Sequence, residues 1–239
     1  MKIPVLSLID EIALARERLL KDPHERPAFE QLQRWQVDRL QRTYADYYRE
    51  ERYRSGLDFF TRDLYGTHDF NSRDRELRKV MHMWCRVLPE RALAAIERAL
   101  GLELLSLALD AQMVAALHGG EITTESYANA YREVGRRPDR ERQISLIVSA
   151  GRSLDELIGH KWIPAALRMA RRPARLAGVS QLHEFLERGY GAFAKMHGAD
   201  QLLSVIEERE TVILKNLFAS APHPFDVIEA DALAGRKAQ

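Results

Sequence analysis

The sequence predicts an all-α protein, a multi-helix bundle of about nine or ten helices around one buried central helix. Hydrophobic residues recur at helical spacing along most of the chain. Alternating β-branched runs and Asn-Gly or Asp-Gly hairpin turns do not occur. The 239 residues are 46% hydrophobic and 30% charged, a composition typical of a chain that buries a core.

The first two helices are predicted from apolar stripes and proline positions. A helix over residues 6–21 ends before Pro23, because a residue that precedes proline disfavours the helical conformation. Its apolar stripe consists of Leu8, Ile12, Ala15 and Leu19. Pro27 suits a first helical turn, so a second helix is expected over residues 27–53. Gly56 is expected to interrupt it.

A short helix then runs through Leu64, and further helices are expected over residues 71–87 and 89–118. Within the last of these, residues 99–117 are apolar on nearly every side, which predicts a helix surrounded by other helices. This stretch also has the length of a membrane span. Glu103 and Asp110 lie inside it, and central charges cost about 2.5–3.5 kcal/mol each on insertion, so a core helix is favoured.

Turn and capping residues divide the rest of the chain. Gly151 is expected to break one helix and Pro173 to end or kink another. The expected helices cover residues 123–134, 138–150, 153–160, 163–171, 180–197 and 200–219. Residues 1–220 then form a single helical domain, and 221–239 form a flexible C-terminal tail. The alternative is a domain boundary near Gly119 and Gly120.

Charge and cysteine content restrict the function classes. Lys+Arg number 36 and Asp+Glu 35, so no overall field selects nucleic acid as a partner, and no recognisable reading motif is present. The lone Cys85 cannot form an internal disulfide. The apolar N-terminus meets Asp10 and Glu11 too early for a signal-peptide core, so a cytoplasmic location is expected.

The most distinctive stretch of the chain is Phe-Phe-Thr-Arg-Asp-Leu-Tyr at residues 59–65. Adjacent Phe59 and Phe60 cannot share one narrow helical face, so this helix is expected to be held on two sides. The stretch resembles the signature of a bacterial family named for an FFLEELY motif. The matching residues are Phe59, Phe60, Leu64 and Tyr65, whereas Asp63 replaces a glutamate and Thr61 and Arg62 depart from the pattern. The resemblance implies relatives of unknown activity and brings no catalytic residues.

Two sets of residues are candidates for a ligand pocket. The corner after this motif offers Tyr65, His68 and Asp69, although its acids can equally serve as helix caps. On the central helix, Glu103, Ser106 and Asp110 project from one side, and His118 continues that side approximately. If the side faces the interior, burial would raise the pKa of one carboxyl group; the alternative is an edge that touches water.

Metal and cofactor sites are not expected. None of the eight histidines has an acidic residue three positions before it, which excludes the Glu-x-x-His pairs of di-iron bundles. His82 with Cys85, and Glu156 with His160, each give two ligands where zinc takes three or four.

Residues 160–178 have the strongest local charge imbalance, because they contain no acid. The basic residues are Lys161, Arg168, Arg171, Arg172 and Arg175. With Trp162 and neighbouring apolar residues, they could lie on anionic lipid or bind a phosphate-bearing ligand; a solvated, acid-paired surface is the alternative.

The sequence therefore favours a noncatalytic protein-interaction module, with the corner at residues 59–74 or the segment at 168–175 as contact surface. The first alternative is a pocket protein or enzyme for a small or lipid-like anionic ligand, with an arginine as anchor. The second is peripheral association with an anionic membrane through residues 160–178. A homodimer is a further candidate assembly.

Overall fold

The computed structural model describes residues 2–64 and 70–227, and every regular element within these ranges is a helix. The predicted all-α class is confirmed. Eleven α-helices and one π-helix, η1, are present in this part of the chain, somewhat more than the sequence suggested. They are α1 (Lys2–Lys21), α2 (Glu25–Thr43), α3 (Ala45–Arg49), α4 (Glu51–Asp58), η1 (Phe59–Leu64), α5 (Phe70–Val87), α6 (Glu90–Leu117), α7 (Thr124–Val134), α8 (Arg137–Ile158), α9 (Ile163–Leu176), α10 (Ser180–Met196) and α11 (Asp200–Phe218).

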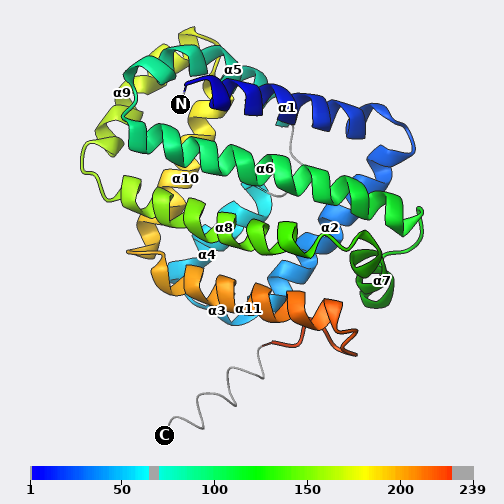
Figure 1. Ribbon diagram of the computed structural model, residues 1–239. Coiled ribbons are helices and arrows are strands. Elements are labelled where there is room, and N and C mark those ends of the chain that lie inside the picture. The colour runs from blue at the N-terminus through cyan, green and yellow to red at the C-terminus, as the bar shows by residue number, and fades with distance from the viewer. Residues whose placement is uncertain (1, 65–69, 228–239) are drawn as a thin grey trace, which may run out of the picture.

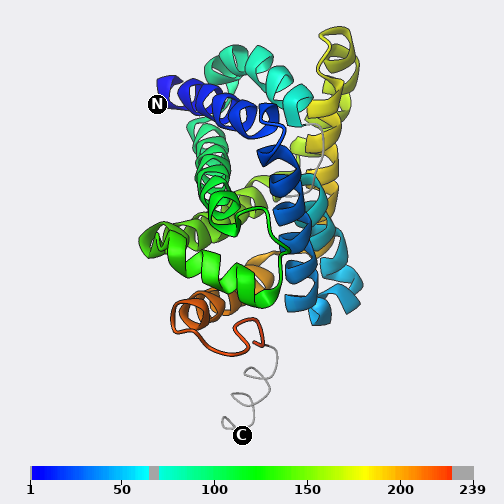
Figure 2. The ribbon, with the colours of Figure 1, turned by 90° about the vertical axis from the view of Figure 1, so that its right-hand side faces the viewer.

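The helices form two layers. In the first, α1, α6, α8 and α11 lie side by side in that order (Figure 1). In the second, α2, α4 and α10 cross behind them, as the turned view shows (Figure 2). Helices α5 and α9 lie at one end of the bundle, where α5 contacts α1 and α10, and α9 contacts α10.

Helix α6 occupies the middle of the first layer, between α1 and α8 (Figure 1). Leu100, Leu107 and Met113 are buried, but Ala108 and Ala115 on its outer side are exposed. The prediction of an encased central helix therefore holds only in part. Among the described residues, α6 is the one helix long and apolar enough to cross a bilayer, and it contacts α1, α2, α7 and α8 here.

Three closely packed glycines lie inside helices, among them Gly56 and Gly151, which were expected to interrupt or break a helix. A Cβ atom on Gly56 of α4 would lie 2.6 Å from Met196 Sδ of α10, and one on Gly151 of α8 would lie 2.5 Å from Leu203 Cδ2. Gly189 of α10 is equally crowded by Phe59. These glycines let helices approach closely, so the predicted break at Gly151 is wrong, and the breaks in the second predicted helix fall elsewhere.

Those breaks occur at Tyr44 and Glu50, which separate α2, α3 and α4. Pro173 does not end its helix, because α9 continues to Leu176. Beyond α11, Phe225 lies against the ring of Trp35 with centroids 5.7 Å apart, and Val227 is buried. The first residues of the expected tail, 221–227, thus pack on the bundle, and residues 228–239 lie outside the described residues.

Candidate functional site

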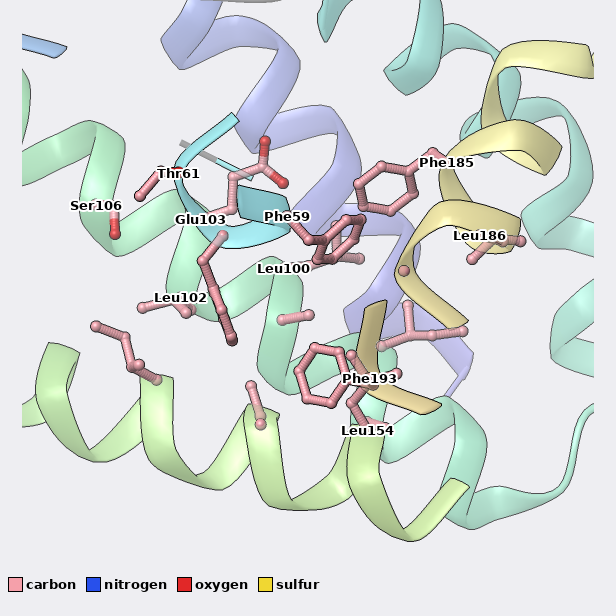
Figure 3. A pocket seen from close by; sticks show the side chains of 18 of the residues that line it. Phe59, Thr61, Leu100, Leu102, Glu103, Ser106, Leu154, Phe185, Leu186 and Phe193 are labelled. Carbon is pink, nitrogen blue, oxygen red and sulfur yellow. The ribbon is translucent and has the colours of Figure 1, made fainter. Parts of the chain in front are cut away.

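A cavity of about 1150 Å³ lies between the two helix layers. Most of its lining residues are apolar and come from both layers. In the close view, leucines of α6 and α8 face aromatic rings of η1 and α10 across this space (Figure 3). The labelled apolar side chains are Phe59, Leu100, Leu102, Leu154, Phe185, Leu186 and Phe193.

The cavity reaches the surface at one end of the bundle. Most of its solvent-exposed lining residues lie on α9 or near the junction of α5 and α6. Met83 and Trp162 are among these residues, with exposed fractions of 56% and 52%. The inner face of α9 therefore covers part of the opening.

The distinctive Phe-Phe pair fixes one wall of the cavity. A π-helix adds one residue to a helical turn, and η1 places both rings against α10. The ring of Phe59 lies 5.3 Å from that of Phe185, and the ring of Phe60 lies 5.7 Å from that of Phe193. The pair is thus held mainly by one helix. Three candidates from the same corner, Tyr65, His68 and Asp69, lie outside the described residues.

The structure brings together Glu103, Ser106 and Asp110 on the cavity wall. Glu103 forms an ion pair with Arg16 of α1, and Asp110, which is 2% exposed, accepts a hydrogen bond of 3.1 Å from Gln36 Nε2. These partners leave both carboxylates engaged in the wall. His118, by contrast, is exposed at the end of α6 and does not join them.

A second polar group in the wall centres on Arg140, which is 5% exposed. Its Nη1 donates to Gln143 Oε1 at 3.2 Å, and Gln143 Nε2 donates to Ser106 Oγ at 2.8 Å. Its guanidinium lies 4.7 Å from the centroid of the Tyr131 ring. Nη2 is buried and has no hydrogen-bond acceptor among the described residues. Burial raises the pKa of the Tyr131 phenol above its ordinary value, so this neighbour stays neutral.

Helix α2 adds a further ion pair to the wall. Arg39 Nη1 donates to Glu210 Oε1 at 2.5 Å, and the Tyr44 hydroxyl donates to the same oxygen at 3.0 Å. The nearby Arg209 guanidinium donates to both carboxylate oxygens of Asp46 at 2.8 and 2.7 Å. This hydrogen bonding lowers the pKa of Asp46.

The predicted basic residues are not part of the cavity wall. All five are exposed on or just before α9: Lys161, Arg168, Arg171, Arg172 and Arg175. Arg171 Nη2 donates to Glu187 of α10 at 2.8 Å. The inner face of the same helix, which includes Ile163, Ala166 and Ala170, lines the cavity.

Sequence analysis missed the arginines of the wall, although their positions carried a signal. Arg16 follows Ile12 by four residues and precedes Leu19 by three, so it lies on the buried stripe of α1. Arg140 precedes Ile144 by four residues and belongs to the inward stripe of α8 in the same way.

Comparisons with known proteins identify one family. The family model described as Domain of unknown function (DUF8198) matches residues 15–224. No curated protein and no solved structure matches the chain.

Proposed function

Because the chain belongs to the family described as Domain of unknown function (DUF8198), whose description names no activity, we propose a function from the geometry of the cavity. The protein binds a long-chain amphiphile, with its apolar chain between the two helix layers and its polar head group at Arg140. The size and apolar lining of the cavity carry this proposal.

The family match confirms the expectation of an uncharacterised family. The FFLEELY motif, the bacterial source and the cytoplasmic location stay predictions. So does the protein-interaction role, which no described contact tests.

The cavity reaches the surface, so it does not stand as a dry void. Water or a ligand must fill it. Since most of the wall is apolar, an apolar molecule that replaces poorly ordered water gains free energy. The volume is slightly above the usual range of small-molecule pockets, about 300–1,000 Å³, which leaves room for a long chain.

Arg140 supports a head group that accepts hydrogen bonds. A buried donor without an acceptor costs about 1–3 kcal/mol, and the cost is higher for a charged group. A carboxylate at Nη2 would remove that cost and form a charge-assisted hydrogen bond. Ser106, which accepts from Gln143, keeps its own hydroxyl hydrogen for the same head group. A long-chain carboxylate therefore fits this wall best.

The binding of saturated fatty acids to delipidated protein, measured by calorimetry, tests the proposal. Each methylene that enters the cavity contributes about 0.8 kcal/mol, so affinity should rise about fourfold per methylene until the cavity is full. Ala150→Phe places a ring in the cavity and should abolish binding of the longest chains. The matched control is Ala108→Phe, on the exposed side of α6, which should bind as the natural protein does.

A comparison of oleate with oleyl alcohol isolates the head group. The natural protein should prefer oleate, and Arg140→Met should weaken oleate binding about 10- to 100-fold, since hydrogen bonds to charged groups are worth about 1.5–3 kcal/mol. Binding of the alcohol should change little. Affinity independent of chain length would refute the cavity proposal, and an unchanged preference for oleate in Arg140→Met would refute the role of Arg140.

A further inference from the structure

We propose that α9 is a membrane-docking lid, which binds an anionic lipid bilayer and passes the amphiphile between that bilayer and the cavity. The transfer step rests on the proposed function, whereas the docking step stands on the surface of α9 alone.

The two sides of α9 differ in what they contact. Ile163, Ala166, Ala170 and Ala174 face the cavity. Met169 and Leu176 do not line the cavity, and they follow Trp162, which lies at the cavity mouth, at seven-residue intervals, so the three share nearly one face of the helix. Their exposed fractions are 52%, 78% and 91%, and they are three of the five large hydrophobic side chains exposed in the described part of the chain.

The charge of this helix selects the partner. Residues 160–178 contain no acid, and Lys161, Arg168, Arg172 and Arg175 form no ion pair with the described residues. Basic side chains that flank an exposed apolar row are the pattern of a helix lying in the interface of an anionic bilayer. Its apolar row enters the acyl boundary, and its guanidinium groups contact the lipid phosphates.

Helix α9 is also attached loosely enough to move. None of the residues Ile163–Leu176 is fully buried, and the main packing partner of the helix is α10. Pro173 has no backbone N–H, so the carbonyl of Met169 loses its usual helical donor. Segments with few buried contacts open at low free-energy cost. Because α9 covers the mouth of the cavity, its displacement toward a bilayer would open the cavity on the lipid side.

Co-sedimentation with vesicles tests docking. Binding should be strong to vesicles in which about a quarter of the phosphatidylcholine is replaced by phosphatidylglycerol, weak to phosphatidylcholine alone, and reduced by salt. Each basic residue near such a surface contributes about fivefold, so Arg168→Glu with Arg172→Glu should weaken binding about 30-fold or more. The matched control reverses two exposed arginines on other helices, Arg34→Glu with Arg142→Glu, and should bind almost as the natural protein does.

The apolar row has its own control. Met169→Ser with Leu176→Ser should weaken vesicle binding, whereas Leu14→Ser, at a side chain 56% exposed on α1, should not. Circular dichroism checks that each variant is folded. The docking proposal would be overturned if the natural protein and the Arg168→Glu, Arg172→Glu variant bound vesicles equally, or if binding did not depend on lipid charge. The basic residues of this helix would then be left with an acidic protein surface as their partner.

The lid is tested by the rate at which a stearate that carries an anthroyloxy fluorophore moves from the protein to vesicles that contain a quencher. The transfer rate should rise with vesicle concentration and anionic lipid, and fall at least tenfold in the Arg168→Glu, Arg172→Glu variant, with unchanged affinity in vesicle-free buffer. A natural protein that binds vesicles but not the probe refutes the proposed function and leaves docking standing. Equal transfer rates for both proteins refute the lid.

Discussion

Replacing Gly189 by alanine tests whether the signature Phe59 is held tightly at the cavity wall. In the structure, an added Cβ would lie 2.8 Å from Phe59 Cζ and 3.2 Å from its Cε2. Gly191, two residues further along α10, has nothing within 4 Å of such an atom. The two substitutions share the helix and the chemical change, so they differ mainly in the contact with the phenylalanine ring.

The expected magnitudes follow from two opposing terms. Alanine gains about 0.8–1.0 kcal/mol over glycine inside a helix, so Gly191→Ala should stabilise the protein by up to that amount. Gly189→Ala has the same gain but forces Phe59 to move, and overpacking costs about 1–3 kcal/mol. Its free energy of unfolding should therefore be about 1–3 kcal/mol below that of Gly191→Ala.

Urea unfolding followed by far-ultraviolet circular dichroism measures this difference in the free energy of unfolding. In thermal unfolding, the same difference should appear as a shift in Tm of about 2–4 °C per kcal/mol for a chain of this length. Phe59→Leu, which removes the ring, should restore at least about 1 kcal/mol to Gly189→Ala in a double-mutant cycle. Equal stability of the two alanine variants would refute the close packing of η1 on α10.

Three further perturbations address the buried charges and the C-terminal segment. Hydrogen bonding from Arg209 lowers the pKa of Asp46 below its unfolded value near 3.9. This carboxylate therefore stabilises the protein above that pH, and its contribution is lost as the pH falls through the folded pKa. In an acid titration, Asp46→Asn should lose less stability below about pH 4 than the natural protein does. Arg16→Met should lower the free energy of unfolding by about 1–3 kcal/mol because the buried Arg16 loses its ion pair with the partly buried Glu103, and thermal unfolding of the double variant with Glu103→Leu should recover part of that loss. Phe225→Ala should lower the free energy of unfolding by about 1–3 kcal/mol and change Trp35 fluorescence, because the ring lies on that indole; unchanged fluorescence would place residues 221–227 away from the bundle.

Helical periodicity was sufficient to predict most of the helices, because one apolar stripe per helix is a local property of the sequence. Glycine was not interpretable in the same way. Gly151 and Gly189 lie inside helices because another helix occupies the space of their side chains, and that neighbour is distant in sequence. The same limit applies to Tyr44, where the break between α2 and α3 leaves the ring buried beside Glu210. Each of these features depends on a tertiary contact that local propensity does not contain.

The candidate site was partly predictable for a related reason. Glu103 and Asp110 are conspicuous in an apolar helix, and both face the cavity. Arg16 and Arg140 were less conspicuous, because arginine is common in this chain and single basic residues on amphipathic helices are usually exposed. Their burial becomes apparent only when each is placed on its apolar stripe.

The cavity depends on small side chains that lie at inward positions of several different helices, so the pattern cannot be recognised from any single helix. Many of its inward positions carry alanine, as at Ala95 on α6, Ala150 on α8 and Ala170 on α9. Elsewhere in the wall, aromatic rings such as Phe59 and Phe193 come from η1 and α10. Leucine at these alanine positions would fill the space and bury more apolar area. Alanine at these positions therefore forgoes stability that the fold could have, which agrees with the proposed binding of a ligand in an open cavity.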